Sequence, residues 1–293
     1  MREPQLLVER VGPLVLVQDL GRPGHASLGV PPSGAADRRA LRLANRIVGN
    51  DEAAPALEVL LGGLALTPHA KVTVAVTGAP APLTVSGRPA PLFAPVDVPA
   101  GHSISLGHPV MGLRSYLAVR GGFEFPRHLG SASSDLTSGL GPPPVRPGTH
   151  LRIGPVPQHR PRHSELAAVH TPITGELHLR AVLGPRDEWF TEEAVRTLNT
   201  ASWQVTSDSD RVGIRLSGPP LSRSKGGELP SEGVIRGAIQ VPASGQPLIF
   251  FADHPTTGGY PVIAVILDED TDLLAQAQPD QRVRFSLQPG RWA

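Results

Sequence analysis

A dense group of polar side chains follows a short apolar run late in the chain. The run Leu248–Phe251 is bounded by turn residues, a pattern typical of a buried strand. A carboxylate, two threonine hydroxyls and a phenol come after it, in Asp253, Thr256, Thr257 and Tyr260. Because a rigid strand followed by a glycine-rich loop can hold such groups at the rim of a cavity, this stretch is the first candidate site.

Asp253 has two interpretations, which differ in what a mutation would do. In the functional one Asp253 is a catalytic base or orients another group, and the nearby hydroxyls donate to a substrate. In the structural one Asp253 accepts hydrogen bonds from backbone N–H groups of the glycine-rich bend. A loop role survives Asp253→Asn at a cost of ~1 kcal/mol, whereas acid–base catalysis typically contributes ~10²–10⁴-fold. The functional interpretation therefore predicts a variant that melts close to wild type and loses most activity.

A helix is predicted from about Ala35 to Val48, where apolar residues recur at helical spacing. Ser33 is its predicted N-cap, and Gly49 is the expected C-terminal stop. Asp37 falls in the first turn, where the helix dipole favours a carboxylate. By themselves these residues make Asp37 a helix-dipole group and Asn45 a buried amide that ties down a loop.

Two predicted strands carry charged or aromatic residues among apolar ones. Glu58 is flanked by Leu and Val, so it must point out of the core or be paired. Arg114 and Tyr116 fall together on one face of a later strand, opposite Leu117 and Val119. That face is either an anion-binding wall or, as is more common, a solvated sheet face.

Composition places the chain among soluble globular proteins. Of its 293 residues, 40% are hydrophobic and 18% are charged, and this length is enough for two modest domains. The net charge is +1 and no basic cluster occurs, so neither nucleic acid nor an anionic membrane is indicated as a partner. No apolar run approaches the ~20 residues of a membrane span, and the first residues lack a signal-peptide core, so a cytoplasmic location is expected.

Cysteine and histidine usage argues against a metal centre. The chain has no cysteine, which excludes disulfides and thiolate ligands. His159 and His163 have a spacing that suggests a metal pair. Pro161 lies between them and prevents a regular helix from presenting both, so no metal site is predicted.

Glycine and proline, at 32 and 33 residues, divide the chain into short segments. Such regular turns predict many short strands and a mainly β barrel or sandwich. Residues 6–20 are interpreted as a hairpin or an entry strand, and residues 155–172 as a linker. A short helix is expected at about Thr191 to Leu198, with Thr191 as its N-cap.

Five blocks of sequence together resemble the biotin-dependent carboxyltransferase-like family. This family includes the C subunit of bacterial ATP-dependent 5-oxoprolinase, and its members have also been called KipA and allophanate hydrolase subunit 2. The blocks occur in the order of the family and extend over nearly the whole chain. They are LGRPGHASLGVPPSGAADRRALRLANRIVGN, LRSYLAVRGGF with HLGSASSDL, SDRVGIRLSGPPL, LPSEGVIRGAIQVPASGQPLIFFADHPTTGGYPVIAVI, and LLAQ.

The resemblance implies two cyclophilin-like β-barrel domains, expected at residues 1–165 and 166–293. It also implies a KipI-like B subunit as partner and a third, lactam-hydrolysing subunit. The reaction implied is the ATP-driven opening of 5-oxoproline to glutamate, with ATP shared within the complex. The substrate carries a carboxylate and a lactam, so its site needs a cation and donors near the carbonyl oxygen.

The resemblance also marks individual positions. Asp253 and Tyr260 are the candidate catalytic residues. The candidate substrate contacts are Arg114, Tyr116, Arg215, Gln240, Thr256 and Thr257. The other positions within the motifs of the family are Asp37, Asn45 and Glu58.

Some positions depart from the usual family pattern. Ala132 stands where the family usually has Arg, and His254-Pro255 replaces Arg-Gln. The run PPPVRPGTHL replaces a segment that usually contains GR and GD. The chain has neither a P-loop nor a GxSxG motif, so nucleotide would bind on another scaffold or be shared with the partner.

Three functions are compatible with this sequence. The first is that of a 5-oxoprolinase component. The second is a biotin-dependent carboxyltransferase acting on a urea-like or acyl substrate, which requires biotin and other chains. The third is a regulatory module that binds a KipI-like kinase inhibitor. Adjacent genes for a KipI-like protein and a lactam hydrolase favour the first, a biotin carboxylase gene the second and a sensor kinase gene the third.

Overall fold

The computed structural model describes residues 5–161, 174–227 and 229–292. The chain forms two compact units, one of Met1–Arg22 with Ser33–Pro172 and the other of Pro23–Pro32 with Ile173–Ala293. His163, the predicted domain boundary after residue 165 and most of the predicted linker lie outside the described residues, so these remain predictions.

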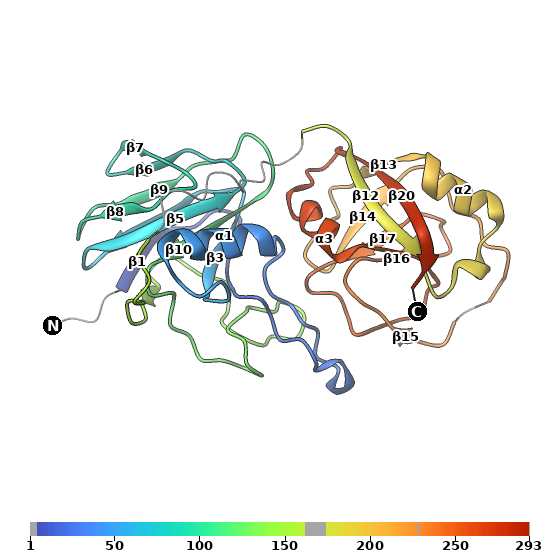
Figure 1. Cartoon of the computed structure of the whole chain (residues 1–293), viewed down its shortest axis with the longest axis horizontal. Helices are drawn as coiled ribbons and strands as arrows, with labels where there is room; N and C mark the ends of the chain where they lie inside the picture. The colour runs from blue at the N-terminus through green and yellow to red at the C-terminus, as the bar shows by residue number, and fades with distance from the viewer. Residues whose placement is uncertain (1–4, 162–173, 228, 293) are drawn as a thin grey trace. The chain divides into compact units, whose positions relative to one another are not determined.

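The first unit consists of two antiparallel sheets around one apolar core (Figure 1). One sheet contains β1 (Gln5–Arg10), β4 (Leu64–Pro68), β6 (Leu83–Val85), β7 (Arg88–Ala90), β9 (Ile104–Leu106) and β11 (His150–Arg152), in the order β11-β1-β4-β9-β6-β7. The other contains β2 (Leu14–Gln18), β3 (Ala56–Leu60), β5 (Val72–Gly78), β8 (Val96–Val98) and β10 (Arg114–Val119), in the order β2-β3-β10-β5-β8. Alternate residues of both sheets, such as Leu66 and Val76, fill the core between them.

The first two strands do not form a hairpin. β1 pairs with β11 and β4, whereas β2 pairs with β3 in the other sheet. The chain crosses between sheets at Gly12, where an added Cβ would lie 1.9 Å from the carbonyl oxygen of Gly62. The hairpin alternative for residues 6–20 is therefore wrong, because this close crossing directs the two strands into different sheets.

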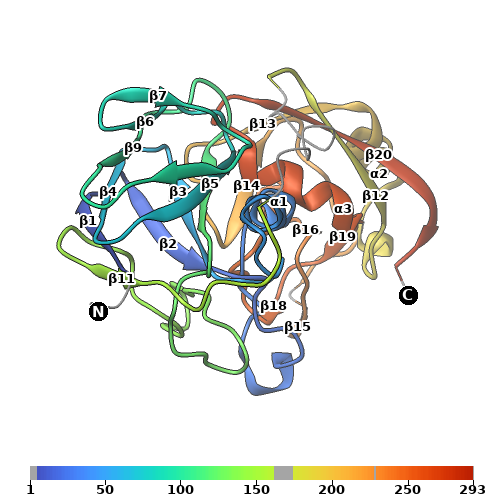
Figure 2. The same cartoon turned by 60° about the vertical axis from the view of Figure 1, so that its left-hand side comes forward.

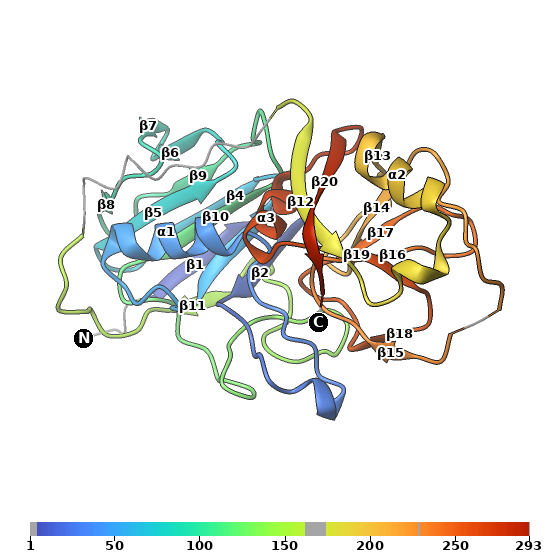
Figure 3. The same cartoon turned by 45° about the vertical axis from the view of Figure 1, so that its right-hand side comes forward.

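Helix α1 (Arg38–Val48) lies across the five-stranded sheet, over β5 and β10 (Figure 3). Leu41 and Ile47 of the helix belong to the same buried cluster as Tyr116 of the sheet. The opposite face of β10 contributes Leu117 to the core between the sheets, as its alternation predicts. Because both faces are covered, all of β10 is buried, and the solvated sheet face expected around Arg114 is wrong.

The helix begins later than predicted. Asp37 is the N-cap, since its side chain accepts a hydrogen bond from the Ala40 N–H at 2.9 Å. Ser33 is not the cap, because four residues separate it from the helix and its own φ is 52°. The predicted stop is confirmed, since Gly49 has a φ of 78° and its N–H caps the last turn.

The second unit is built on a closed seven-stranded barrel (Figure 2). Its strands are β12 (Leu177–Leu183), β13 (Ser202–Val205), β14 (Gly213–Ser217), β16 (Ala238–Gln240), β17 (Leu248–Phe250), β19 (Val262–Ile266) and β20 (Arg282–Arg291). They follow the order β12-β19-β16-β17-β14-β13-β20, and the parallel pair β12–β20 closes the barrel. Trp203 and Phe285 are among its largest buried side chains. The predicted mainly β fold is confirmed.

Short elements surround the barrel. Helix α2 (Glu192–Thr200) packs against β20, and Thr191 caps it as predicted by accepting from the Ala194 N–H at 3.1 Å. Strands β15 (Glu232–Gly233) and β18 (Thr257–Gly258) pair outside the barrel. The remaining elements are η1 (Ala26–Leu28), η3 (Asp187–Trp189), α3 (Asp268–Thr271) and η4 (Asp272–Gln276). None of the helices described here has the length and apolar character needed to cross a membrane.

Candidate functional site

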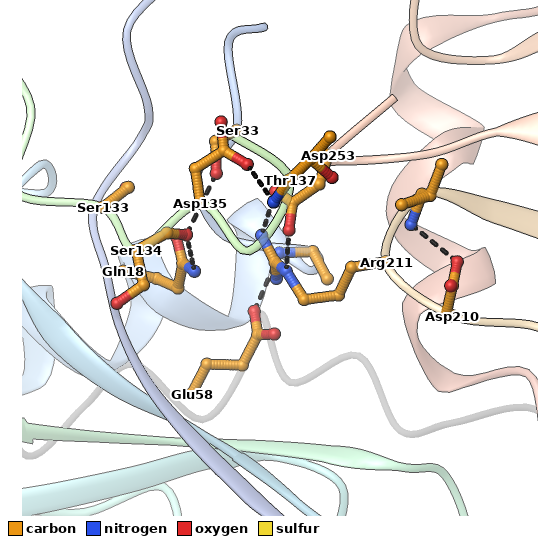
Figure 4. A network of polar contacts seen from close by, with 12 residues as sticks. Gln18, Ser33, Glu58, Ser133, Ser134, Asp135, Thr137, Asp210, Arg211 and Asp253 are labelled. Carbon is orange, nitrogen blue, oxygen red and sulfur yellow. Dashed lines mark hydrogen bonds and ion pairs between the residues drawn. The ribbon is translucent and has the colours of Figure 1, made fainter. Parts of the chain in front are cut away.

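Asp253 is locked in a buried ion pair with Arg211 (Figure 4). The Arg211 Nε donates to Asp253 Oδ2 at 2.7 Å, and its Nη2 donates to Oδ1 at 2.8 Å. The backbone N–H of Asp253 also donates to the Arg211 carbonyl at 2.8 Å. Both side chains are almost inaccessible, at 4% and 1% exposure. This bidentate geometry fixes the plane of the guanidinium relative to the plane of the carboxylate.

The pairing favours one of the two functional roles considered for Asp253. A carboxylate whose two oxygens both face a guanidinium is poorly placed to accept a proton from a substrate. It is well placed to orient Arg211, so Asp253 is a positioning residue in this geometry. The expectation that Asp253→Asn would melt close to wild type must also be revised, because that substitution removes the charge facing a buried cation.

Sequence reasoning selected Arg215 in this region and missed Arg211. Arg215 is exposed in β14, between the buried Ile214 and Leu216, and the structure does not bring it to Asp253. Arg211 lies just before the strand, in the SDRVG block that carries part of the family resemblance. That block was the only signal for Arg211, and it did not indicate which of its two arginines is buried.

The backbone of the loop after Asp253 is held by a buried side chain, and its hydroxyl-bearing residues are exposed or partly exposed to solvent. The Gln240 Nε2 donates to the Tyr260 carbonyl at 2.7 Å. The Arg223 guanidinium lies 5.8 Å from the centre of the Tyr260 ring. Tyr260 and Thr257 are exposed, Thr256 is partly exposed, and their hydroxyls make no hydrogen bonds within the described part of the chain. The loop therefore leaves three hydroxyls able to donate to a ligand, and their contact with a substrate stays a prediction.

Gln240 has a different role from the one predicted. It is buried, and its amide is used to hold the backbone of the loop. A Cβ at Gly258 would lie 2.7 Å from Gln240 Nε2, so the two residues fit together only because position 258 is glycine. The opposing strand β15 is fixed in turn by hydrogen bonds between Arg186 and Glu232, which raise the pKa of Arg186.

His254 directly follows Asp253 and is one of the positions where the resemblance led us to expect arginine. Its ring is buried, and Nδ1 lies 2.7 Å from the Pro255 carbonyl oxygen, so Nδ1 carries the proton and donates. Burial lowers the pKa of His254, and the Arg236 cation lowers it further. The side chain at this position is therefore a neutral imidazole at neutral pH.

In the first unit Glu58 is the centre of a second polar cluster. The Tyr116 hydroxyl donates to Glu58 Oε2 at 2.7 Å, and the Ala36 N–H donates to the same oxygen at 2.9 Å. The Arg114 Nε lies 3.6 Å from Glu58 Oε1. The Asp37 N–H donates to the Tyr116 hydroxyl oxygen at 2.7 Å. The prediction that Glu58 must be paired or leave the core is confirmed, since it is buried and paired.

The predicted contacts Arg114 and Tyr116 are therefore engaged with the protein itself. Arg114 is 5% exposed and Tyr116 is fully buried beneath α1. Together with Glu58 they hold the start of α1 against the sheet. Asn45 has the structural role foreseen for it, because its amide donates to the carbonyls of Glu52 and Ala54 and so ties down the loop after the helix.

We expect the phenol of Tyr116 to ionise only far above pH 10. Burial, followed by the Glu58 and Asp37 charges, raises the pKa of Tyr116 well above its ordinary value of 10.0. The folded state then holds this proton more tightly than the unfolded state. The resulting stabilisation is complete below about pH 10 and is lost as the pH rises further.

The chain has only two tyrosines, so the Tyr260→Phe variant isolates Tyr116. Near-ultraviolet titration of this variant should show phenolate only at the pH where circular dichroism reports unfolding. Reversible ionisation near pH 10 in a folded protein would contradict the buried pairing with Glu58.

A third cluster, which we call the Asp19 cluster, joins Asp19 to the segment Ser131–Ser134. The hydroxyls of Ser131 and Ser133 each donate to Asp19 Oδ1 at 2.6 Å. The Gly21 N–H donates to the same oxygen at 2.8 Å, and the Ala132 N–H donates to Oδ2 at 2.8 Å. Four donors thus converge on one buried carboxylate.

The Asp19 cluster continues into Gln18 and Arg22. The Gln18 Nε2 donates to the Ser134 carbonyl at 2.9 Å (Figure 4), and Arg22 donates to the Ser133 carbonyl. Gln18 Oε1, Arg22 Nη1 and Ser134 Oγ are buried and have no partner within the described residues, so the cluster retains capacity for a small polar group. Sequence reasoning missed these residues, although they lie in the LGRPG and GSASSD portions of the family blocks or beside them.

The loop Ser33–Asp37 links the Glu58 and Asp19 clusters. Gly34 has a φ of 89°, and a Cβ there would lie 2.8 Å from the Gly21 nitrogen, so the bend requires glycine. Four residues of the loop each donate a hydrogen bond to a distant part of the chain. The bonds are Ser33 Oγ to Ser134 O, Ala35 N to Asp19 O, Ala36 N to Glu58 and Asp37 N to Tyr116. The loop is therefore set in one conformation by long-range contacts.

Comparison with known proteins relates the chain to one family. A family model described as a carboxyltransferase domain, subdomains A and B, matches residues 28–287. The chain is 37% identical to the C subunit of 5-oxoprolinase from Escherichia coli over 96% of its own length and 90% of that protein. It is 34% identical to urea amidolyase of Saccharomyces cerevisiae over 92% of its length, which is 16% of that protein.

Solved structures agree with the sequence comparison. The urea amidolyase of K. lactis superposes with a TM-score of 0.92 at 29% identity, covering 97% of this chain and 19% of that one. The same fold therefore occurs both in proteins of about this size and as a small part of much longer chains.

Proposed function

Because the chain belongs to the carboxyltransferase subdomain A and B family, we propose that it is the C subunit of an ATP-dependent 5-oxoprolinase that works with a KipI-like partner. The observation that carries this proposal is coverage. The chain matches 90% of the C subunit of E. coli 5-oxoprolinase but only 16% of the yeast urea amidolyase. Nearly every region of the C subunit therefore has a counterpart in this chain, whereas most of the urea amidolyase does not.

The proposed reaction opens the lactam of 5-oxoproline. The bond between the ring nitrogen and the carbonyl carbon breaks, and water supplies a hydroxyl to the carbon and a proton to the nitrogen. A second water cleaves ATP to ADP and phosphate, which drives the opening. Charge develops on the carbonyl oxygen as the bond breaks, so donors directed at that oxygen accelerate the step.

Within this chain, the loop hydroxyls of Thr256, Thr257 and Tyr260 are the groups best placed for such donation. They are uncommitted, and the loop is held by Gln240 and by strand β15. Asp253 supports the site by fixing Arg211 rather than by moving a proton. The sequence has no P-loop, and we assign no step of ATP chemistry to residues of this chain.

A carboxyltransferase is the alternative favoured by a specific observation. The family description and the TM-score of 0.92 to a urea amidolyase both match that activity. In this case the chain would transfer a carboxyl group from biotin to a urea-like substrate. Biotin and the carboxylase would be supplied by other chains, because this sequence contains neither a biotin-attachment motif nor a biotin carboxylase region.

We expect the isolated chain to release no glutamate from 5-oxoproline and ATP. Mixing it with its KipI-like partner and with a lactam-hydrolysing protein should give glutamate and ADP in equal amounts. Glutamate formation is followed by a coupled dehydrogenase and ADP by chromatography. Turnover by the purified single chain would contradict the dependence on partners, and urea-dependent consumption of carboxybiotin by the mixture would favour the alternative.

The same complex tests the loop. Thr257→Val keeps the shape of the side chain and removes a hydroxyl that makes no contact within the described residues, so folding should be unchanged. We expect kcat to fall about fivefold, because a single neutral hydrogen bond contributes about 1 kcal/mol. Thr84→Val, at a partly exposed strand position of the first unit, is the matched control. Equal rates for both variants would place the donors elsewhere.

A further inference from the structure

A basic pocket lies at the surface of the second unit. Its volume is about 360 Å³, which is within the range of small-molecule sites. The walls are the segment Pro220–Gly226 and the turn Ala243–Gly245. The lining residues include the cations Arg223 and Lys225 and three serine hydroxyls, but no carboxylate.

Both walls of the pocket are fixed by the backbone. The Leu221 N–H donates to the Gly245 carbonyl at 2.9 Å, which joins one wall to the other. The Ser224 N–H donates to the Trp189 carbonyl at 2.8 Å, which anchors the first wall to the 3-10 helix η3. Gly245 has a φ of 76°, and a Cβ there would lie 2.9 Å from Pro220, so the turn requires glycine. The pocket is therefore preformed.

Arg223 donates to a backbone carbonyl, and Lys225 is ion-paired with Glu188, which is not among the residues that line the pocket. The Arg223 Nη2 donates to the Val241 carbonyl at 2.5 Å, and Nε is buried with no partner in the described part of the chain. The Lys225 Nζ lies 3.7 Å from Glu188, a separation that exposes it to competition from another anion. Lys225 is half exposed, so it can turn toward a bound group.

The hydroxyls add donors to these charges. Ser244 Oγ accepts from the Gln246 N–H at 3.4 Å, which leaves its own O–H available to donate. Ser222 is exposed and lines the same wall as the two cations. Two positive charges with two hydroxyl donors match a group that has two negative charges and several acceptor oxygens.

We propose that this pocket binds the phosphate group of a small phosphorylated molecule or free phosphate. A phosphate monoester carries about two negative charges at neutral pH and offers three acceptor oxygens, whereas a carboxylate offers one charge and two. Arg223 supplies the charge of a guanidinium and Lys225 a point charge. The proposal does not depend on the 5-oxoprolinase assignment, since it rests only on the residues that line the pocket.

The lysine content of the chain allows a direct test. Lys71 and Lys225 are its only lysines, and Lys71 lies in the first unit, ion-paired with Asp97 at 2.8 Å. Treatment with an amine-acetylating reagent, followed by peptide mass spectrometry, therefore measures the acetylation rate of one lysine in the pocket and of one outside it. Inorganic phosphate should slow acetylation of Lys225 at least threefold and leave Lys71 unchanged, with sodium chloride at equal ionic strength as reference. Equal slowing of both lysines, or of neither, would overturn the proposal.

Calorimetry with variants gives the second arm. Lys225→Gln should weaken binding of inorganic phosphate about tenfold, while Lys71→Gln should leave it unchanged. Both lysines are exposed, so neither variant should affect folding. Titrations with pyrophosphate and ATP, without magnesium, distinguish the two possible ligands. Tighter binding of ATP than of inorganic phosphate would indicate a site for a phosphorylated molecule. Unchanged affinity in Lys225→Gln would refute the assignment.

Discussion

Replacing Asp253 by Asn is expected to lower the free energy of unfolding by about 3–5 kcal/mol, the usual effect of removing one partner of a buried ion pair. Both carboxylate oxygens accept N–H groups of Arg211. In Asn one of those oxygens becomes an NH₂ group, so a donor faces a donor. The negative charge that compensates the buried guanidinium is lost as well. Urea unfolding followed by circular dichroism measures the change.

Asp210→Asn is the matched control for this prediction. Asp210 precedes Arg211, is exposed and accepts only backbone N–H groups, from Val212 and Gly213. It should lose about 1 kcal/mol or less. A second variant, Arg211→Met with Asp253→Leu, removes both charges and should be more stable than Asp253→Asn alone. If the free energy of unfolding of Asp253→Asn is within about 1 kcal/mol of wild type, the ion pair does not hold the loop. The catalytic interpretation of Asp253 would then be favoured again.

The second large effect is expected at Asp19. Its carboxylate accepts four hydrogen bonds, three at Oδ1 and one from the Ala132 N–H at Oδ2. Asp19→Asn can retain the three at Oδ1, but its NH₂ group then faces the Ala132 N–H. We expect a loss of about 3 kcal/mol, because one buried donor is left unsatisfied and the other bonds lose their charge assistance.

Hydrogen exchange locates this second effect. Amides of the segment Ser131–Asp135 should exchange faster in Asp19→Asn, while those of the barrel strands β14 and β17 should not. Asp51→Asn is the control, because Asp51 is exposed and its side chain accepts a single hydrogen bond, from the Ala53 N–H. Unchanged protection of Ser131–Asp135 would mean that the Asp19 cluster does not hold this segment.

The local features of the fold were predictable because they depend on neighbours in the sequence. Frequent glycine and proline residues, together with short apolar runs, indicated a mainly β chain. Gly49 ends α1 and Thr191 begins α2 for reasons contained within a few residues. The cost of burying an unpaired charge required that Glu58 be paired or exposed, whatever the fold. The cap of α1 was misplaced because Ser33 and Asp37 are both good capping residues.

Sequence patterns were therefore sufficient to predict the class of fold, the polar character of the loop after β17 and, through the motifs, the family. Which polar groups bond to one another inside the protein depends on tertiary contacts. Arg211 meets Asp253 across 42 positions, and Ser133 meets Asp19 across 114. Residues so far apart in the chain leave no periodic pattern from which their contact could be predicted. Arg211 and Arg215 are chemically alike in the sequence, and they differ because the folded chain buries the first and exposes the second.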